Sequence, residues 1–123
     1  MRTIEDHKVN PANDKLTLQV LDEPGGGGAC HVYQMSGYHE KTVDETAVVI
    51  RFQNGPINEV GVNGLTHEVL LSIVADRLRS FQAGPFSCKE NACALTKIEE
   101  AQHWLQSRTL ARMRRGVEGT HAV

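Results

Sequence analysis

The alternation of apolar and polar residues in the first half of the chain predicts β-strands. Residues 15–21 alternate, with Leu16, Leu18 and Val20 on one face and Thr17 and Gln19 on the other, which is the period of a half-buried strand. Residues 29–35 and 46–52 are the next two predicted strands, and the unbroken apolar run at 47–50 favours a third strand covered on both faces. The Pro and four Gly at 24–28 are a flexible connector that suits a hairpin between the first two strands.

The pattern changes to that of a helix after a break at residues 53–61, which is rich in Asn, Gly and Pro. Asn63 or Thr66 can cap this first helix, which we expect to run to about Gln82. The Gly84-Pro85 pair then ends it, because proline cannot continue a helix.

A second predicted helix follows after a short turn. Ser87 with Glu90 three residues later is a capping-box signature, and no helix breaker occurs before Gly116. Its roughly 28 residues would extend about 42 Å, and two long helices joined by a few residues form an antiparallel hairpin. The sequence therefore predicts an α+β chain with a small N-terminal antiparallel β-sheet region at 1–60 and a long antiparallel helical hairpin with a C-terminal tail at 61–123, together one compact domain.

The first helix carries more apolar surface than one neighbouring helix can cover. At ~100° per residue its apolar side chains spread over about 240°, whereas one partner helix covers roughly half of that. These residues are Leu65, Val69, Leu70, Leu71, Ile73, Val74, Leu78 and Phe81. The excess must be buried by the sheet or by other copies of the chain, and the small size of the sheet favours a homo-oligomer.

Two stripes of the second helix contain residues of interest for binding. Asn91 lies near the middle of the apolar stripe, and a buried amide needs partners, so it either bridges the helices or meets a ligand. From spacing alone, the bridge is favoured. On the neighbouring stripe, cations flank Trp104, as suits a phosphate-bearing ligand with a stackable base; a solvated face with a half-buried Trp fits the pattern equally. These cations are Lys97, Arg108 and Arg115.

Composition excludes several classes of partner. The 123 residues (13.6 kDa) include 13 Lys and Arg against 15 Asp and Glu, a net charge of −2 that argues against a binder of duplex nucleic acid. No apolar run approaches the ~20 residues that a membrane span needs, and residues 1–10 lack the apolar core of a signal peptide. We therefore expect a cytoplasmic protein with no membrane partner and with three free cysteines.

The motifs of hydrolytic and metal chemistry are missing from the sequence. His67-Glu68 lacks the second His of the helical zinc motif, since Leu71 stands there, and the six His are scattered. There is no Gly-x-Ser-x-Gly motif, no His-x-Thr/Ser pair and no Gly-Lys-Ser/Thr after the glycine run. We expect neither an enzyme nor a bound cofactor or metal. The helix start at 63–66 suits an anion, but an ordinary cap has the same residues.

Five segments of the second half resemble the helical hairpin shared by two phage anti-defence families. One is the anti-CBASS sponge, which is little more than the hairpin. The other is the first type of Thoeris anti-defence protein, which carries a β-sheet region before it, and the strand-rich residues 15–52 make the chain similar to this second family. The segments are Gly61–Leu71, Asp76–Leu78, Phe81–Phe86, Glu90–Ala92 and Arg115–His121.

The resemblance implies a sponge that is not an enzyme. Thoeris systems answer infection with a cyclic ADP-ribose isomer, and the phage protein binds this signal intact and removes it from solution. Family members are homo-oligomers, described as dimers and as hexamers built from dimers, and some hold cyclic di- or trinucleotides in separate pockets. The resemblance therefore implies cyclic ADP-ribose isomers as the partners, met in the cytoplasm of the infected bacterium. Cyclic oligonucleotides at a second site are the partners of some members, and the chain need not bind both ligand types.

The resemblance also implies the site residues. An aromatic, an amide and an arginine of the hairpin bind ADP-ribose-type ligands in the family, and they correspond to Phe81, Asn91 and Arg108, which shifts Asn91 towards ligand contact. The candidate residues for the cyclic oligonucleotide site are Asn63, Thr66, Arg112, Thr120 and His121. The alternative hypothesis is a small structural or protein-binding phage factor whose basic helix stripe docks an acidic partner.

Overall fold

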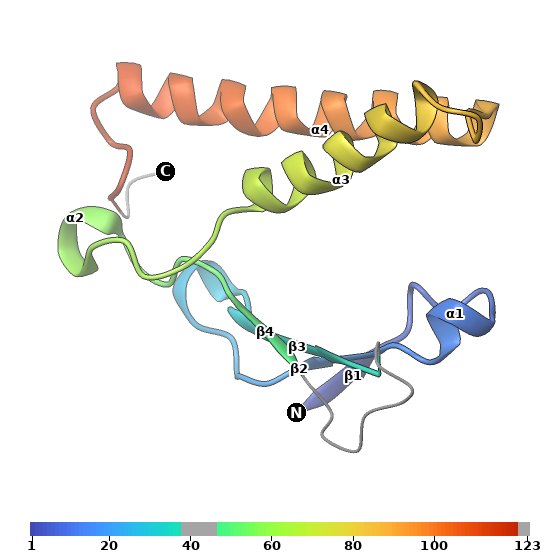
Figure 1. Ribbon diagram of the computed structural model, residues 1–123. Coiled ribbons are helices and arrows are strands. Elements are labelled where there is room, and N and C mark those ends of the chain that lie inside the picture. The colour runs from blue at the N-terminus through green and yellow to red at the C-terminus, as the bar shows by residue number, and fades with distance from the viewer. Residues whose placement is uncertain (38–46, 121–123) are drawn as a thin grey trace. The chain divides into compact units, whose positions relative to one another are not determined.

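The computed structural model describes residues 1–37 and 47–120 and divides into two compact units. The first unit contains Met1–Gly55 and Val60–Leu65, and the second contains Pro56–Glu59 and Thr66–Val123. Figure 1 shows a β-sheet in the first unit and two long helices, α3 and α4, in the second. The predicted α+β class is confirmed, with an antiparallel sheet preceding a helical hairpin.

The sheet has four antiparallel strands in sequence order. They are β1 (Arg2–Ile4), β2 (Thr17–Val20), β3 (Val32–Ser36) and β4 (Val48–Arg51). The last three correspond to the three predicted strands, although β3 ends one residue beyond the predicted range 29–35. Thr46, the first residue predicted for the third strand, lies outside the described residues. A one-turn helix, α1 (Pro11–Asp14), separates β1 from β2, and its N-cap Asn10 accepts a hydrogen bond from the Asn13 backbone.

The connector between β2 and β3 contains the predicted glycine run, which forms the tight turn η1 (Gly26–Gly28), with Gly27 and Gly28 in left-handed backbone (φ 72° and 79°). The Asp22 carboxylate closes this connector by accepting hydrogen bonds from the backbone N–H groups of His31 (2.8 Å) and Val32 (3.0 Å). Desolvation raises the pKa of Asp22, but the backbone hydrogen bonds together lower it by more than desolvation raises it. The pKa of Asp22 therefore lies below its ordinary value. Above that pKa the charged carboxylate stabilises the hairpin.

The prediction that the third strand is covered on both faces is wrong for the single chain. Val48 and Val49 of β4 are each 43% exposed, and in the sheet β4 stands at the end of the strand order. A run of β-branched residues favours extended backbone by its local packing, and this preference does not determine how much of the strand is covered.

The loop that follows β4 is held together by hydrogen bonds from amide side chains. The Asn63 side chain forms two hydrogen bonds with the backbone of Asn54 (2.8 and 2.7 Å), and Gln53 binds the backbone of Gly55, Gly61 and Asn63. Leu65 then pairs with Phe52 in a parallel bridge. The short helix α2 (Ile57–Val60) lies within this loop.

The hairpin consists of α3 (His67–Gln82) and α4 (Lys89–Arg114), and their bounds agree closely with the prediction. Thr66 caps α3 through a hydrogen bond from the Val69 backbone. The predicted Ser87 cap of α4 is wrong by one residue, because Cys88 is the N-cap. The reason is tertiary: the Gln82 side chain binds both the N–H and the C=O of Cys88 (each 3.1 Å) and fixes the helix start there.

The two helices pack through a narrow apolar seam. Leu95, Ile98 and Leu105 of α4 are half-buried, but among the described residues of the hairpin Ala75 is the one fully buried apolar side chain. Ile73 remains 57% exposed, so α3 does present more apolar surface than α4 covers. Within the described part of the chain, no helix combines the length and the apolar character of a membrane span.

Candidate functional site

Two open hollows lie at the turn end of the hairpin. The larger, of about 470 Å³, is lined by residues of both helices, and the smaller, of about 370 Å³, lies along the end of α3 and the turn. Both volumes fall within the ~300–1,000 Å³ typical of small-molecule sites. Arg77, Phe81 and Phe86 line both hollows, and the larger one also contains Asn91. The structure thus brings together two of the three residues predicted for the ADP-ribose-type site.

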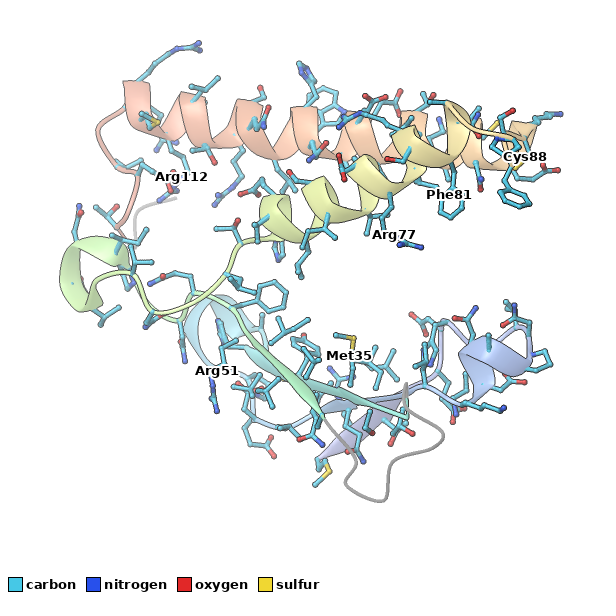
Figure 2. The ribbon with its side chains drawn as sticks, in the orientation of Figure 1. Met35, Arg51, Arg77, Phe81, Cys88 and Arg112 are labelled. Atoms are coloured by element: carbon cyan, nitrogen blue, oxygen red, sulfur yellow. The ribbon has the colours of Figure 1, made fainter. Side chains whose placement is uncertain are left out.

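The aromatic wall shared by the two hollows is Phe81, which is 38% exposed. The guanidinium of Arg77, one helical turn earlier, lies over its ring at 5.4 Å from the centroid, within the range of a cation–π contact. Figure 2 shows both side chains on the same side of α3, turned away from α4. An exposed ring next to a cation offers a stacking surface for a planar base.

The amide in the larger hollow is Asn91, in the first turn of α4. Its backbone N–H donates to the Sγ of Cys88 (3.4 Å), so the helix cap fixes the position of this residue. Its side-chain amide is half-buried and has no hydrogen-bond partner among the residues that the structure describes. Because it forms no hydrogen bond to α3 among the described residues, the amide does not bridge the helices, and its polar atoms can meet a ligand.

Arg108 lies far from this hollow within one chain. It is exposed on α4, 17 positions after Asn91, which corresponds to about 25 Å along the helix axis. Trp104, one turn before Arg108, is 70% exposed and contacts the ring of His103. The predicted stripe of cations around the indole is therefore a solvated face of the single chain.

The helix-start candidates for the second site are engaged in internal contacts. The Asn63 side chain uses both of its polar atoms to bind the Asn54 backbone. The Thr66 hydroxyl oxygen accepts the hydrogen bond that caps α3. A ligand at this helix start would meet a hydroxyl that can still donate, but an amide whose hydrogen bonds are already formed.

Residues 117–120 of the tail fold around the side chain of Arg112, which is 9% exposed. We call this set of contacts the clasp. Its guanidinium donates to Glu118 (3.1 Å) and to the backbone C=O groups of Val117 (2.9 Å) and Thr120 (3.2 Å). The Thr120 hydroxyl itself donates to the Val117 carbonyl. The structure thus brings Arg112 and Thr120 together, whereas His121 lies outside the described residues.

Sequence reasoning missed two lining residues, Arg77 and Phe86. The signal for Arg77 was its position four residues before Phe81 on one helix, since side chains at this spacing are neighbours. Phe86 is 72% exposed next to the turn. Its signals were its place between the two predicted helices and its position at the end of the family-like segment Phe81–Phe86.

The described part of the chain contains no group of three His, Cys, Asp or Glu side chains placed to hold a metal ion. The two hollows are lined by an aromatic pair, an amide, a hydroxyl and one residue of each charge. This arrangement suits recognition of a planar, polar small molecule. The fold and site therefore define a class of small α+β proteins with a ligand-sized hollow at the turn of a helical hairpin.

Comparisons with known proteins identify the family within this class. Residues 44–110 match the family model described as Acb2/Tad1, hairpin domain. The chain is also 53% identical over 116 residues to "Thoeris anti-defense 1" of Bacillus phage SBSphiJ7, a match that covers 92% of this chain and 75% of that relative. The chain belongs to the Acb2/Tad1 hairpin family, and its sheet-containing N-terminal part extends the likeness to the Thoeris anti-defence proteins.

Proposed function

We propose that this protein is a phage anti-defence sponge that binds cyclic ADP-ribose-type signals and holds them without cleaving them. The observation that carries the proposal is the meeting of Phe81 with the unpartnered Asn91 amide at one hollow of ligand size. The name of the 53% identical phage relative supports the same role. The protein would act in the cytoplasm of the infected bacterium and block Thoeris immunity.

In this proposal the ring of Phe81 stacks on the adenine base, and Asn91 hydrogen-bonds a polar edge of the ligand. Stacking of a base on an aromatic side chain contributes about 1–3 kcal/mol. Arg108 would bind the pyrophosphate through its planar fork of donors. Because Arg108 and Asn91 lie about 25 Å apart in one chain, the Arg108 that completes a site would belong to a second copy.

A homo-oligomer, a dimer or a hexamer, is therefore part of the proposal. The exposed apolar side chains of α3, among them Val69 and Ile73, supply a surface that a second copy would bury. A monomer in solution would contradict this part.

Cyclic di- or trinucleotides are the proposed ligands of a separate site at the helix start and the tail, through which the protein would also act on CBASS signals. The residues of this site are Asn63, Thr66, Arg112, Thr120 and His121. Asn63 and Arg112 each have partners within their own unit, so a ligand that used either side chain would displace those contacts.

The residues that line the hollows support the proposal of sequestration without turnover. They supply one carboxylate and one hydroxyl, Asp76 and Ser80, and the Ser80 hydroxyl donates to the Asp76 backbone carbonyl (3.1 Å). Nucleophilic catalysis needs a hydroxyl activated by an adjacent base, and this hydroxyl is instead bound to the helix backbone. We therefore propose that the ligand leaves the site chemically unchanged.

The test is isothermal titration with a panel of cyclic ADP-ribose isomers, followed by denaturation and chromatography of the bound ligand. Phe81→Ala and Asn91→Ala should each raise Kd about 10- to 150-fold, because each loses about 1.5–3 kcal/mol of contact. Gln106→Ala removes an exposed amide elsewhere on α4 and should bind like the wild type. Recovery of linearised ligand, or no binding of any isomer, would refute the proposal.

The alternative, a protein-binding factor, has one observation in its favour: Arg108 and Trp104 lie on an exposed face of α4. It predicts no nucleotide binding in the titration and a loss of partner binding in Arg108→Ala.

A further inference from the structure

We infer that Arg77 is a ligand-binding residue that supplies, from the same chain as Phe81 and Asn91, the positive charge holding the phosphate groups of the bound nucleotide. The inference rests on the proposed function and adds to it a residue and a direction of binding. Neither the residues expected from the family nor the sequence pattern assigned Arg77 a role.

The position of Arg77 is the first argument. Arg77 lines both hollows, and it is the one positively charged residue among the described residues that line them. A pyrophosphate carries two negative charges into its site. Since Arg108 of the same chain lies about 25 Å away along α4, the charge supplied within one chain comes from Arg77.

The availability of its hydrogen-bond donors is the second argument. A guanidinium has five N–H donors, and in the described structure the Arg77 group contacts the face of Phe81 and meets no carboxylate or carbonyl. Arg79, two residues later on α3, is instead bound to Glu99 at 3.1 Å. The Arg77 fork is thus held in place by the ring with its donors still unused.

The distribution of charge around the two hollows gives the direction of binding. The smaller hollow includes the carboxylate-bearing Asp76 together with Ser80, whereas the larger hollow has Asn91 and no acidic residue. A carboxylate repels phosphate and accepts hydrogen bonds from ribose hydroxyls. The phosphates therefore bind between Arg77 and Asn91, and the hydroxyl-rich ribose lies on the Asp76 side of the Phe81 ring.

The experiment measures the Kd of a cyclic ADP-ribose isomer for wild type, Arg77→Gln, Arg77→Lys and Arg79→Gln by titration at two salt concentrations. Arg79→Gln is the matched control, because it makes the same charge change on the same helix at an exposed ion pair. Arg77→Gln should raise Kd at least tenfold and weaken the dependence of Kd on salt, because one charge–phosphate contact is lost. Arg77→Lys should keep the salt dependence but recover only part of the affinity, because an ammonium lacks the fork.

Two outcomes would overturn the inference. The first leaves the proposed function standing, and the second refutes it as well. If Phe81→Ala and Asn91→Ala weaken binding while Arg77→Gln has the Kd of Arg79→Gln, the role of Arg77 is wrong and the proposed function stands. If the folded wild-type protein binds no isomer, the proposed function fails and the inference fails with it. Circular dichroism of each variant excludes unfolding, which we do not expect because the Arg77 side chain is exposed.

Discussion

Replacing Arg112 tests whether the end of the chain is held by a clasp. The substitution Arg112→Gln removes the guanidinium that binds Glu118 and the carbonyls of Val117 and Thr120 at 2.9–3.2 Å. Hydrogen bonds to a charged group contribute about 1.5–3 kcal/mol each, but not additively. Glu118 is 37% exposed and is rehydrated once released, so we expect the tail to lose about 2–3 kcal/mol of local stability.

Native-state hydrogen exchange measures this loss directly. The Val117 amide donates to the Arg112 carbonyl and the Thr120 amide to the Val117 carbonyl, so both exchange when the tail opens. A loss of 2–3 kcal/mol makes their exchange about 30- to 150-fold faster. Arg112→Lys should show most of the effect, because an ammonium cannot reach all three acceptors in a fork.

The control is Arg114→Gln, which removes an exposed charge two residues later on α4. Its exchange rates at both amides should equal those of the wild type. Unchanged exchange in Arg112→Gln would refute the clasp. If that variant also lost binding of a cyclic trinucleotide, Arg112 would be a ligand contact, as the resemblance to the family implies.

Three further predictions concern the sheet, the turn and the assembly. Gly64→Ala should lower the melting temperature strongly in circular dichroism, because the new Cβ would lie 2.3 Å from backbone, whereas Gly84→Ala, with its nearest contact at 3.5 Å, should have little effect; equal melting temperatures would contradict this. Wild-type stability should be complete above the ordinary pKa of Asp, about 3.9, and fall as the pH drops through the lowered pKa of Asp22. In Asp22→Asn this acid-dependent loss of stability should be smaller. Urea titrations at several pH values measure the free energy of unfolding, and the same pH dependence in the variant and the wild type would contradict the prediction. Ile73→Asp should keep the helical spectrum of the single chain, since Ile73 is 57% exposed, but dissociate the proposed oligomer in light scattering; a wild-type mass of 13.6 kDa would refute the assembly.

The helices were predictable because their ends depend on local chemistry. A hydroxyl at Thr66, the Gly84-Pro85 pair and Gly116 mark starts and stops that neighbouring residues suffice to set. The cap of α4 was misplaced because a residue from α3, Gln82, selects Cys88 over Ser87. Sequence spacing carries no record of such a tertiary contact.

In the strands, too, features set by neighbouring residues were predictable and features set by the whole sheet were not. The alternation in β2 predicted a strand with one covered face, and Val20 at its end is fully buried. The strand β1 escaped prediction because Arg2–Ile4 is too short to show a period. The exposure of β4 depends on its place at the end of the strand order, which is a property of the whole sheet.

The candidate site was predictable only in part. Phe81 and Asn91 were expected together from the family resemblance, and the antiparallel hairpin brings them to one hollow. The internal partners of Asn63 and Arg112 were not predictable, because they lie in a loop and a tail without periodicity. Arg77 was missed although it stands four residues before Phe81, because the same spacing also fits a cation on a solvated helix face.

All the described residues that line the two hollows fall between positions 74 and 91. Contacts over so short a stretch close quickly and at little entropic cost, so this half of the site depends on contacts that are local in the sequence. Such a segment can also pass between genes as one piece. Exchange of whatever precedes the hairpin would leave these walls intact, and selection could then vary the N-terminal part and the recognition of the nucleotide independently.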